Sequence, residues 1–207
     1  MVKWPEIRLN GQVIFEDPVM DPQKFLKSAY RHLNINYPKF FKMDALSKLA
    51  IISTGVLLKN QELTHHYAAQ EIGIILQNSS SSLETDEKHQ ESINDLMNYF
   101  PSPSIFVYTL PNIMIGEMAI KHKIQGENMV LISKIPDARQ IVELVKELFL
   151  QNRVKCCIAG WVEAYHGEMS ACLALVEKEE APIPFDDTKE MIIFDLSNFE
   201  RIVNEVL

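Results

Sequence analysis

Two short apolar runs, residues 71–78 and 129–133, constrain the possible folds of this chain most strongly. Each run is continuous rather than alternating, which is typical of a strand buried on both faces. The second run is followed by a segment whose apolar residues recur at helical spacing. These residues are Ile141, Leu144, Val145, Leu148 and Phe149. Strands that alternate with helices predict an α/β fold, with a mostly parallel sheet, helices on both faces and right-handed crossovers.

Three further runs complete the expected sheet. Residues 154–161 and 171–177 are separated by a loop short enough to join an antiparallel pair, and residues 7–15 are a candidate first strand. The sequence therefore predicts a mixed, mostly parallel sheet of five strands.

Four more helices are expected around this sheet. Asp21-Pro22 is suited to begin a helix that continues to about residue 33, and Asp44 is suited to cap a helix over 45–58. Residues 81–84 have capping-box spacing, and a polar, exposed helix is predicted over 87–99. The helix expected over 112–124 has apolar residues around most of its circumference, so it should be nearly enclosed.

The length and composition fit one globular domain. The chain has 207 residues, of which 47% are apolar and 23% are charged. We expect a single domain over 1–207, with a core in 1–180 and a C-terminal extension in 181–207. Pro182 and Pro184 break the chain before a candidate strand at 191–194 and a helix from Asn198.

Charge and cysteine usage exclude several classes of function. A net charge of −8 argues against nucleic acid as a partner, because binding to phosphates needs clustered Lys and Arg. No window approaches the roughly 18 apolar residues of a membrane span, and the first residues do not form a secretion signal.

Cys156, Cys157 and Cys172 are expected to be buried packing residues in a reducing, cytoplasmic compartment. His65, His66 and His89 lack metal-ligand spacing, and we expect neither a metal nor a cofactor.

A family resemblance is carried by several blocks in a fixed order. A Phe106-Val107 turn is followed by Asn112 and a helical Gly116, and ten residues later Gly126 opens the run 126–133. These blocks resemble the N-terminal half of β-ketoacyl-(acyl-carrier-protein) synthases, in which this run delivers the catalytic cysteine. Residues 158–164 are similar to the family's next strand and its Ala-Gly-x-x-Glu turn. Residues 9–11 and 40–49 resemble a subgroup associated with bacterial aryl-polyene and resorcinol-type lipid pathways.

The resemblance implies half of a thiolase-like fold, but two departures put its chemistry in doubt. Ile135 stands at the position expected for the nucleophilic cysteine, give or take one residue, and thioester attack needs an activated nucleophile. The family's C-terminal half, with its two catalytic histidines, has no match. We therefore assign no catalytic residue, and we expect something to cover the face that the second half would cover.

The resemblance also suggests which residues line an acyl pocket or a subunit interface. These residues are Tyr108, Thr109, Asn112, Ile115, Gly116, Met118, Ile132 and Ile135. For Asn112, Tyr108 and Thr109 the simpler interpretation is favoured, in which Asn112 caps the helix and the other two pack nearby.

Three functional hypotheses remain open at this point. The first is a catalytically degenerate partner, a homodimer or a heterodimer with a condensing enzyme, that acts like a chain-length factor in fatty-acid or polyketide-type synthesis. Its interface would be the helix over 112–124. The second is a module that binds an acyl thioester or an acyl carrier protein, with Lys121, Lys123, Lys146 and Arg153 as candidate docking residues.

The third and least favoured hypothesis is an acyltransferase with an unconventional nucleophile, such as Ser133, Cys156 or Cys157. Separately, the serines of residues 79–82 could bind a phosphate at a helix N-terminus, but simple capping is favoured because Glu84 and Asp86 are close in the sequence.

Overall fold

The computed structural model describes residues 1–59, 62–95, 97 and 99–178, so the strand and helix predicted beyond residue 190 lie outside the described part. The strands are β1 Val2–Lys3, β2 Glu6–Leu9, β3 Gln12–Glu16, β4 Ile72–Asn78, β5 Asn128–Ile132, β6 Cys156–Tyr165 and β7 Glu168–Glu177. The α-helices are α1 Pro22–His32, α2 Ala45–Leu58, α3 Leu83–Glu91, α4 Pro103–Phe106, α5 Ile113–His122 and α6 Ala138–Leu150. Short 3-10 helices are η1 Pro38–Lys42, η2 Leu63–His65, η3 Ala69–Glu71 and η4 Val107–Thr109.

The sheet has seven strands in the order β3-β2-β1-β7-β6-β4-β5, so the prediction of five was wrong. The candidate strand over 7–15 is in fact the hairpin β2–β3, and β1 precedes it. Asn10 and Gly11 form the two-residue turn, and both have positive φ, of 50° and 78°. An Asn-Gly pair with this geometry is a strong hairpin signal, which the strand interpretation overlooked.

The prediction of a mostly parallel sheet was also wrong, although the sheet is mixed as expected. β4 pairs in parallel with β5 and β6, whereas β6–β7, β7–β1, β1–β2 and β2–β3 are antiparallel. The parallel part coincides with the segments joined by helical crossovers, and the remaining strands extend the sheet through antiparallel pairings. The predicted antiparallel pair near the C-terminal end is confirmed as β6–β7.

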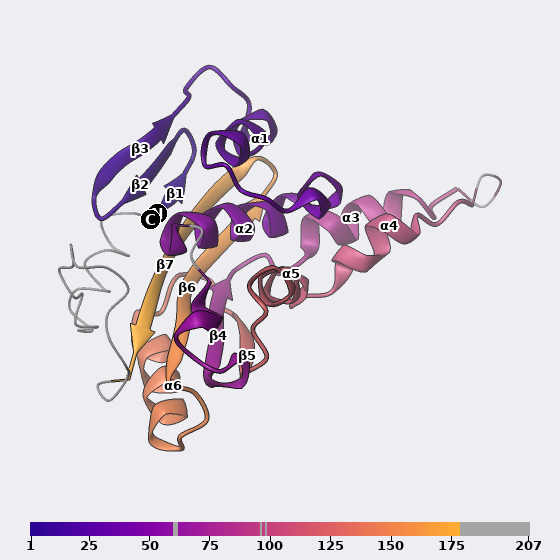
Figure 1. The fold of residues 1–207 in the computed structure, drawn as a ribbon. Helices are drawn as coiled ribbons and strands as arrows, with labels where there is room; N and C mark the ends of the chain where they lie inside the picture. Colours follow the sequence, from indigo (N-terminus) through magenta and orange to yellow (C-terminus); the bar gives the residue numbers. More distant parts are fainter. Residues whose placement is uncertain (60–61, 96, 98, 179–207) are drawn as a thin grey trace.

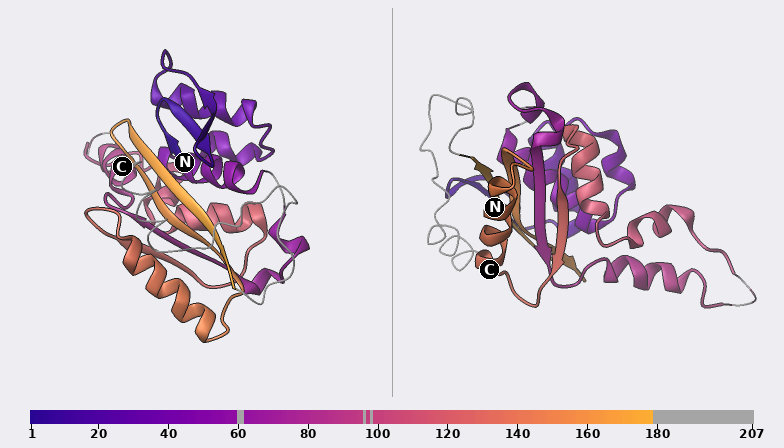
Figure 2. Two further views of the ribbon diagram at one scale, coloured as in Figure 1. Left: turned by 90° about the vertical axis from the view of Figure 1, so that its left-hand side faces the viewer. Right: turned by 90° about the horizontal axis from the view of Figure 1, so that it is seen from below.

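Helices cover both faces of the sheet, as predicted (Figures 1 and 2). On one face α1, α2 and α5 build the larger core, in which Phe25, Leu49 and Met114 are fully buried. On the other face α6 packs Ile141 and Val145 against β4, β6 and β7. The predicted caps Asp21, Asp44 and Asp137 accept backbone N–H groups at the starts of α1, α2 and α6.

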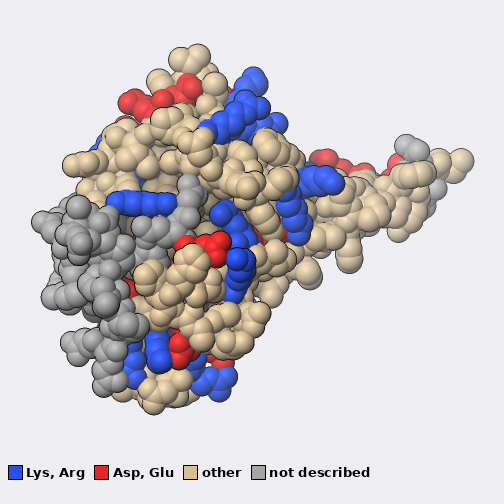
Figure 3. All heavy atoms as spheres, viewed as in Figure 1, with Lys and Arg blue, Asp and Glu red and all other residues tan. Residues whose placement is uncertain are grey.

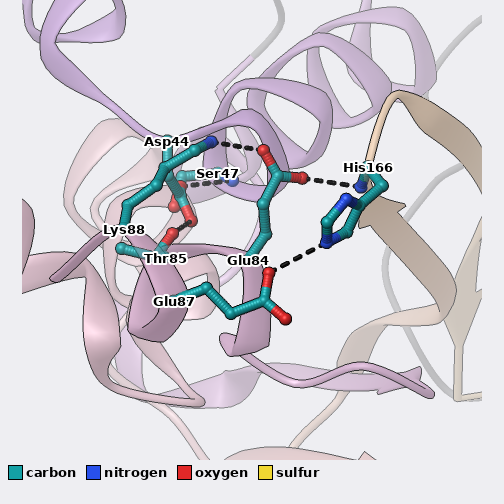
Figure 4. Close-up of polar contacts among 7 residues, drawn as sticks. All are labelled: Asp44, Ser47, Glu84, Thr85, Glu87, Lys88 and His166. Carbon is teal, nitrogen blue, oxygen red and sulfur yellow. Dashed lines mark hydrogen bonds and ion pairs between the residues drawn. The ribbon is translucent and has the colours of Figure 1, made fainter. Parts of the chain in front are cut away.

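The helix expected over 87–99 begins earlier and is shorter, because α3 covers Leu83–Glu91. Its end is marked by Ser92, whose hydroxyl donates to the carbonyl of His89 at 2.7 Å and competes with further helical bonding. The predicted capping box of Ser81 and Glu84 does not form. The helix α3 begins after Ser82, and Glu84 instead accepts the backbone N–H of His166 and pairs with Lys88 (Figure 4). Figure 1 shows α3 and α4 together as an arm that projects from the body of the protein.

β5 lies at the edge of the sheet and pairs only with β4, so the expectation of a fully buried strand was wrong. Ile132 is 56% exposed at its end. The helix α5 is enclosed on one side only, because Ile120 is 64% exposed while Met114 and Met118 are buried. A continuous apolar run in an edge strand leaves apolar side chains exposed to solvent, where they are free to contact another molecule.

Candidate functional site

The loop between β5 and α6 occupies the position where the family resemblance places a nucleophile. Ile135 is 71% exposed, and the Ser133 hydroxyl donates to its carbonyl at 2.7 Å. Gln77, which is fully buried, accepts the Asp137 N–H at 2.8 Å and donates to the side chain of Gln140 at 2.8 Å. The loop is thus fixed by a polar network that includes no histidine base, and nothing in it activates a hydroxyl for acyl transfer.

The three cysteines are free and buried, as predicted. Burial raises the pKa of the Cys157 thiol to about 12, and burial also raises the pKa of Cys156 and Cys172. Because the thiolate is the reactive form, none of the three is prepared for attack on a thioester.

The serine run after β4 is occupied by a carboxylate of the chain itself. Glu163, on β6, accepts the backbone N–H groups of Ser79 and Ser80 at 2.5 and 3.1 Å, and it also accepts both hydroxyls. These groups would otherwise suit a phosphate. Ser79 and Ser80 therefore hold Glu163, whereas Ser82 is the N-cap residue of α3 but makes no side-chain capping bond.

The eight residues predicted for an acyl pocket or interface lie in two different environments. Tyr108, Ile115 and Met118 are buried, whereas Asn112, Ile132 and Ile135 are exposed, and Thr109 and Gly116 are intermediate. Asn112 precedes α5 without a side-chain capping bond. An open hollow of about 450 Å³ lies elsewhere, and its lining is polar rather than suited to an acyl chain. Its residues are Gln70, Gln125, Gly126, Glu127, Asn128 and Arg153.

Exposed apolar side chains gather on neighbouring elements, and we call this set the apolar edge. Its members are Phe106, Val107, Leu110, Ile120, Met129, Ile132 and Ile135, each at least 43% exposed. They come from α4, η4, the residue that follows η4, α5, β5 and the loop after β5, and η4 contacts α4 and α5, which in turn contacts β5. On β5, Ile132 lies on the α5 face and Met129 on the α6 face, so the set wraps around the edge of the sheet. An exposed apolar set of this kind, beside an unpaired strand edge, is typical of a protein interface.

Beneath the apolar edge lies a buried carboxylate that the sequence did not reveal. Glu117, on α5, is fully buried and accepts hydrogen bonds from the phenols of Tyr37 at 2.9 Å and Tyr108 at 3.1 Å. Lys39 neutralises it through an ion pair of 2.7 Å. Burial, followed by Glu117 itself, raises the pKa of Tyr37 and Tyr108 above the ordinary range.

The structure also has a basic surface that we did not predict from the sequence. Residues 21–59 contain seven Lys or Arg and two carboxylates, in a chain whose net charge is −8. Figure 3 shows Lys and Arg side chains gathered over α1. Lys24, Lys27 and Arg31 are exposed at helical spacing on α1, and neither Lys27 nor Arg31 forms an ion pair with any described carboxylate. We call these three residues the basic stripe.

The docking residues expected from the sequence do not form one surface. Lys123 pairs with Glu62 at 3.0 Å, and Arg153 pairs with Glu127. Lys146 belongs to α6, on the opposite face of the sheet from α5 and Lys121.

Two arrangements are absent from the described residues. They contain no group of three His, Cys, Asp or Glu side chains placed to hold a metal ion. They also contain no helix of the length and hydropathy needed to cross a bilayer.

Comparison with solved structures identifies the fold. A structure described as "the ishigamide ketosynthase/chain length factor" matches with a TM-score of 0.59 at 18% identity over 79% of this chain and 49% of that chain. The fold is ketosynthase-like. A chain from the complex of the ketosynthase ApeO with its chain length factor ApeC, from Xenorhabdus doucetiae, matches with a TM-score of 0.56 at 14% identity over 85% of this chain and 75% of that chain.

The extent of these ketosynthase-like matches differs. This chain spans about half the length of the ishigamide protein but three quarters of the chain from the second complex, so that second chain is only somewhat longer than this one. Neither a family model nor a curated protein matches the sequence.

Proposed function

We propose that this protein is a non-catalytic subunit that binds a condensing enzyme of the fatty-acid or polyketide type, in the manner of a chain-length factor. The apolar edge carries this proposal, because it puts exposed side chains of a ketosynthase-like fold beside an unpaired strand. The subgroup suggested by the sequence, which serves aryl-polyene or related lipid synthesis, is part of the proposal. A homodimer is the alternative form of the same association.

Two observations support a partner rather than an independent enzyme. Ile135 replaces the expected nucleophile and is exposed next to Ile132, so this loop presents an apolar surface instead of a reactive group. The outer surface of α6 carries Arg139, Glu143, Lys146 and Glu147 and is solvated, which favours the apolar edge over this helix as the contact. Structural neighbours that combine a ketosynthase with a chain length factor are consistent with this role.

Co-expression with a candidate condensing enzyme of the same organism tests the proposal. The two chains should copurify at a fixed ratio, measured by size-exclusion chromatography with light scattering. A chain that remains monomeric alone, and that does not associate with this enzyme, would contradict the proposed function.

A charge in the apolar edge should abolish this association without unfolding the chain. Ile132→Glu is expected to weaken the complex by about 100-fold or more, because a charge buried at an interface without a partner is costly. The free chain should keep its stability to within about 0.5 kcal/mol, since Ile132 is already exposed.

The matched control for this change is Leu150→Glu. Leu150 is 77% exposed at the end of α6, so the same charge is introduced away from the apolar edge. Affinity should be measured by isothermal titration calorimetry for both variants. Equal loss in the two variants would rule out the apolar edge as the interface.

A second candidate function, binding of an acyl carrier protein, is favoured by the basic stripe. On α1 the like charges of Lys24 and Lys27 are three residues apart and those of Lys27 and Arg31 four apart, so they repel one another, and an acidic partner would relieve this repulsion. We expect Lys27→Glu with Arg31→Glu to weaken binding of the carrier protein by about tenfold at low salt, with a smaller effect at high salt.

Arg139→Glu with Lys146→Glu makes the same change of charge on the outer surface of α6 and should leave carrier binding unchanged. Fluorescence anisotropy with a labelled carrier protein measures both pairs. If the wild-type chain binds no carrier protein, this second function is excluded, whereas an equal loss for both pairs would indicate net charge rather than a docking surface.

A further inference from the structure

We infer that Glu117 is a positioning residue that holds the partner-facing segment of the chain from the inside. The inference rests on the proposed function, because it assigns a role toward the apolar edge. It starts from the position of Glu117, which is fully buried on α5 directly below η4.

The three contacts of this carboxylate reach two separate segments of the chain. Tyr108 belongs to η4, between the exposed residues Val107 and Leu110 of the apolar edge. Tyr37 precedes η1, and Lys39 lies within it. Glu117 therefore ties η1 and η4 to the interface helix α5 through three side chains.

The energetics make this tie strong. A buried carboxylate is tolerated only when it is paired and hydrogen-bonded, and removing one member of such a set leaves the others uncompensated. The tyrosines alone do not neutralise the charge, so Lys39 is essential to the arrangement. Because the Lys39 side chain is 44% exposed, its ammonium can return to water when Glu117 is removed.

The contacts of Glu117 affect how well η4 is ordered, and Glu117 itself does not touch the partner. η4 is a single short turn, which has little stability of its own. The Tyr108–Glu117 bond fixes this turn, so that Phe106, Val107 and Leu110 are presented in one arrangement. An interface that is ordered before binding avoids part of the entropy cost of association.

Hydrogen exchange of the full-length chain tests the inference without a partner. In Glu117→Gln, amide exchange should become at least tenfold faster in residues 106–110 and 37–42, while β4 and β6 keep their protection. Lys39→Met should act in the same way, and Lys39→Arg should restore slow exchange because it keeps the ion pair. Glu62→Gln is the control, since it removes only an exposed carboxylate that pairs with Lys123 near the end of α5.

Two results of this experiment would overturn the inference: unchanged exchange in both segments, or a uniform increase in every element, which would mean that Glu117 only contributes to overall stability. The complex with the condensing enzyme provides the second measurement. Its dissociation constant should rise about tenfold in Glu117→Gln, and an unchanged constant would refute the positioning role. If the wild-type chain forms no complex, the proposed function fails, and the exchange experiment still decides whether Glu117 orders η4.

Discussion

Replacing Gly160 by alanine is expected to lower the free energy of unfolding by about 3 kcal/mol or more, a large fraction of the roughly 5–15 kcal/mol that stabilises a typical domain. Gly160 lies in the middle of β6 with φ of 151°, in a region that side chains rarely adopt. A Cβ atom there would come within 2.0 Å of the Cys172 carbonyl oxygen and 3.0 Å of the Leu173 Cα. Both are backbone atoms of the paired strand β7, so no rotamer change can relieve the contact.

Gly116→Ala is the matched control for this substitution. A Cβ atom on Gly116 would meet nothing within 4 Å, and the residue lies inside α5. Alanine there should raise stability by about 0.5–1 kcal/mol, because glycine is unfavourable inside a helix.

Urea denaturation followed by circular dichroism measures both glycine variants. A Gly160→Ala variant as stable as the wild type would show that the β6–β7 pairing can move apart, contrary to the close approach described. If Gly160→Ala does not accumulate in cells while Gly116→Ala does, this result also supports the expected difference in stability. Both variants replace a glycine by alanine, so only the position of the change differs.

The parts of the fold that were predicted correctly depend on local signals. α1, α2 and α6 begin at Asp residues that cap their N-termini, and the apolar spacing of α6 matches the face it buries. Such signals act within one or two turns of chain, so they can be recognised in a single sequence.

The errors in the predicted fold arose where tertiary context decides the outcome. A continuous apolar run fits a buried strand, but β5 is an edge strand whose apolar residues remain in solvent. The run over 112–124 fits an enclosed helix for the same reason, yet Ile120 is exposed. Both errors fall on the apolar edge, because the residue types in a single sequence do not distinguish exposed apolar residues from those of a core.

Part of the candidate site could be read from the sequence and part could not. That residues 126–152 contain no cysteine concerns residue types only, and the loss of catalysis that we infer from it stays a prediction. Glu117 was missed, since its partners Tyr37 and Lys39 are about 80 residues away in the sequence. The basic stripe could have been found from the excess of Lys and Arg over 21–59, had charge been counted by segment instead of over the whole chain.

Acid is expected to destabilise the protein through His122, which is buried at the C-terminal end of α5. Its Nε2 atom has no hydrogen-bond partner among the residues that the structure describes, and burial, with a smaller contribution from Lys121, lowers its pKa to about 3. An unfolded histidine has a pKa of about 6.5, so between these values the unfolded chain binds a proton that the folded chain excludes. The stability from this residue is complete above about pH 6.5 and is lost as the pH falls toward 3.

The size of the effect follows from the same shift in pKa. At about pH 4.5 the loss should be roughly 2–3 kcal/mol, from about 1.4 kcal/mol for each pH unit below 6.5. His122→Leu removes the titrating group and should flatten this dependence, leaving stability at neutral pH equal or higher because the unpaired nitrogen is also removed.

Urea denaturation of the wild type and His122→Leu at several values between pH 7 and 4.5 tests this expectation. His65→Gln is the control, because the side chain of His65 is 73% exposed. This variant should show the same change of stability with pH as the wild type. The difference in stability between wild type and His122→Leu should grow steadily as the pH decreases. If the two proteins lose stability in parallel, His122 is not the buried neutral histidine described, and the acid sensitivity must arise from other groups. A difference that grows only below about pH 6.5 would show that protonation of His122, on the helix that also carries Glu117 and Ile120, causes the loss of stability.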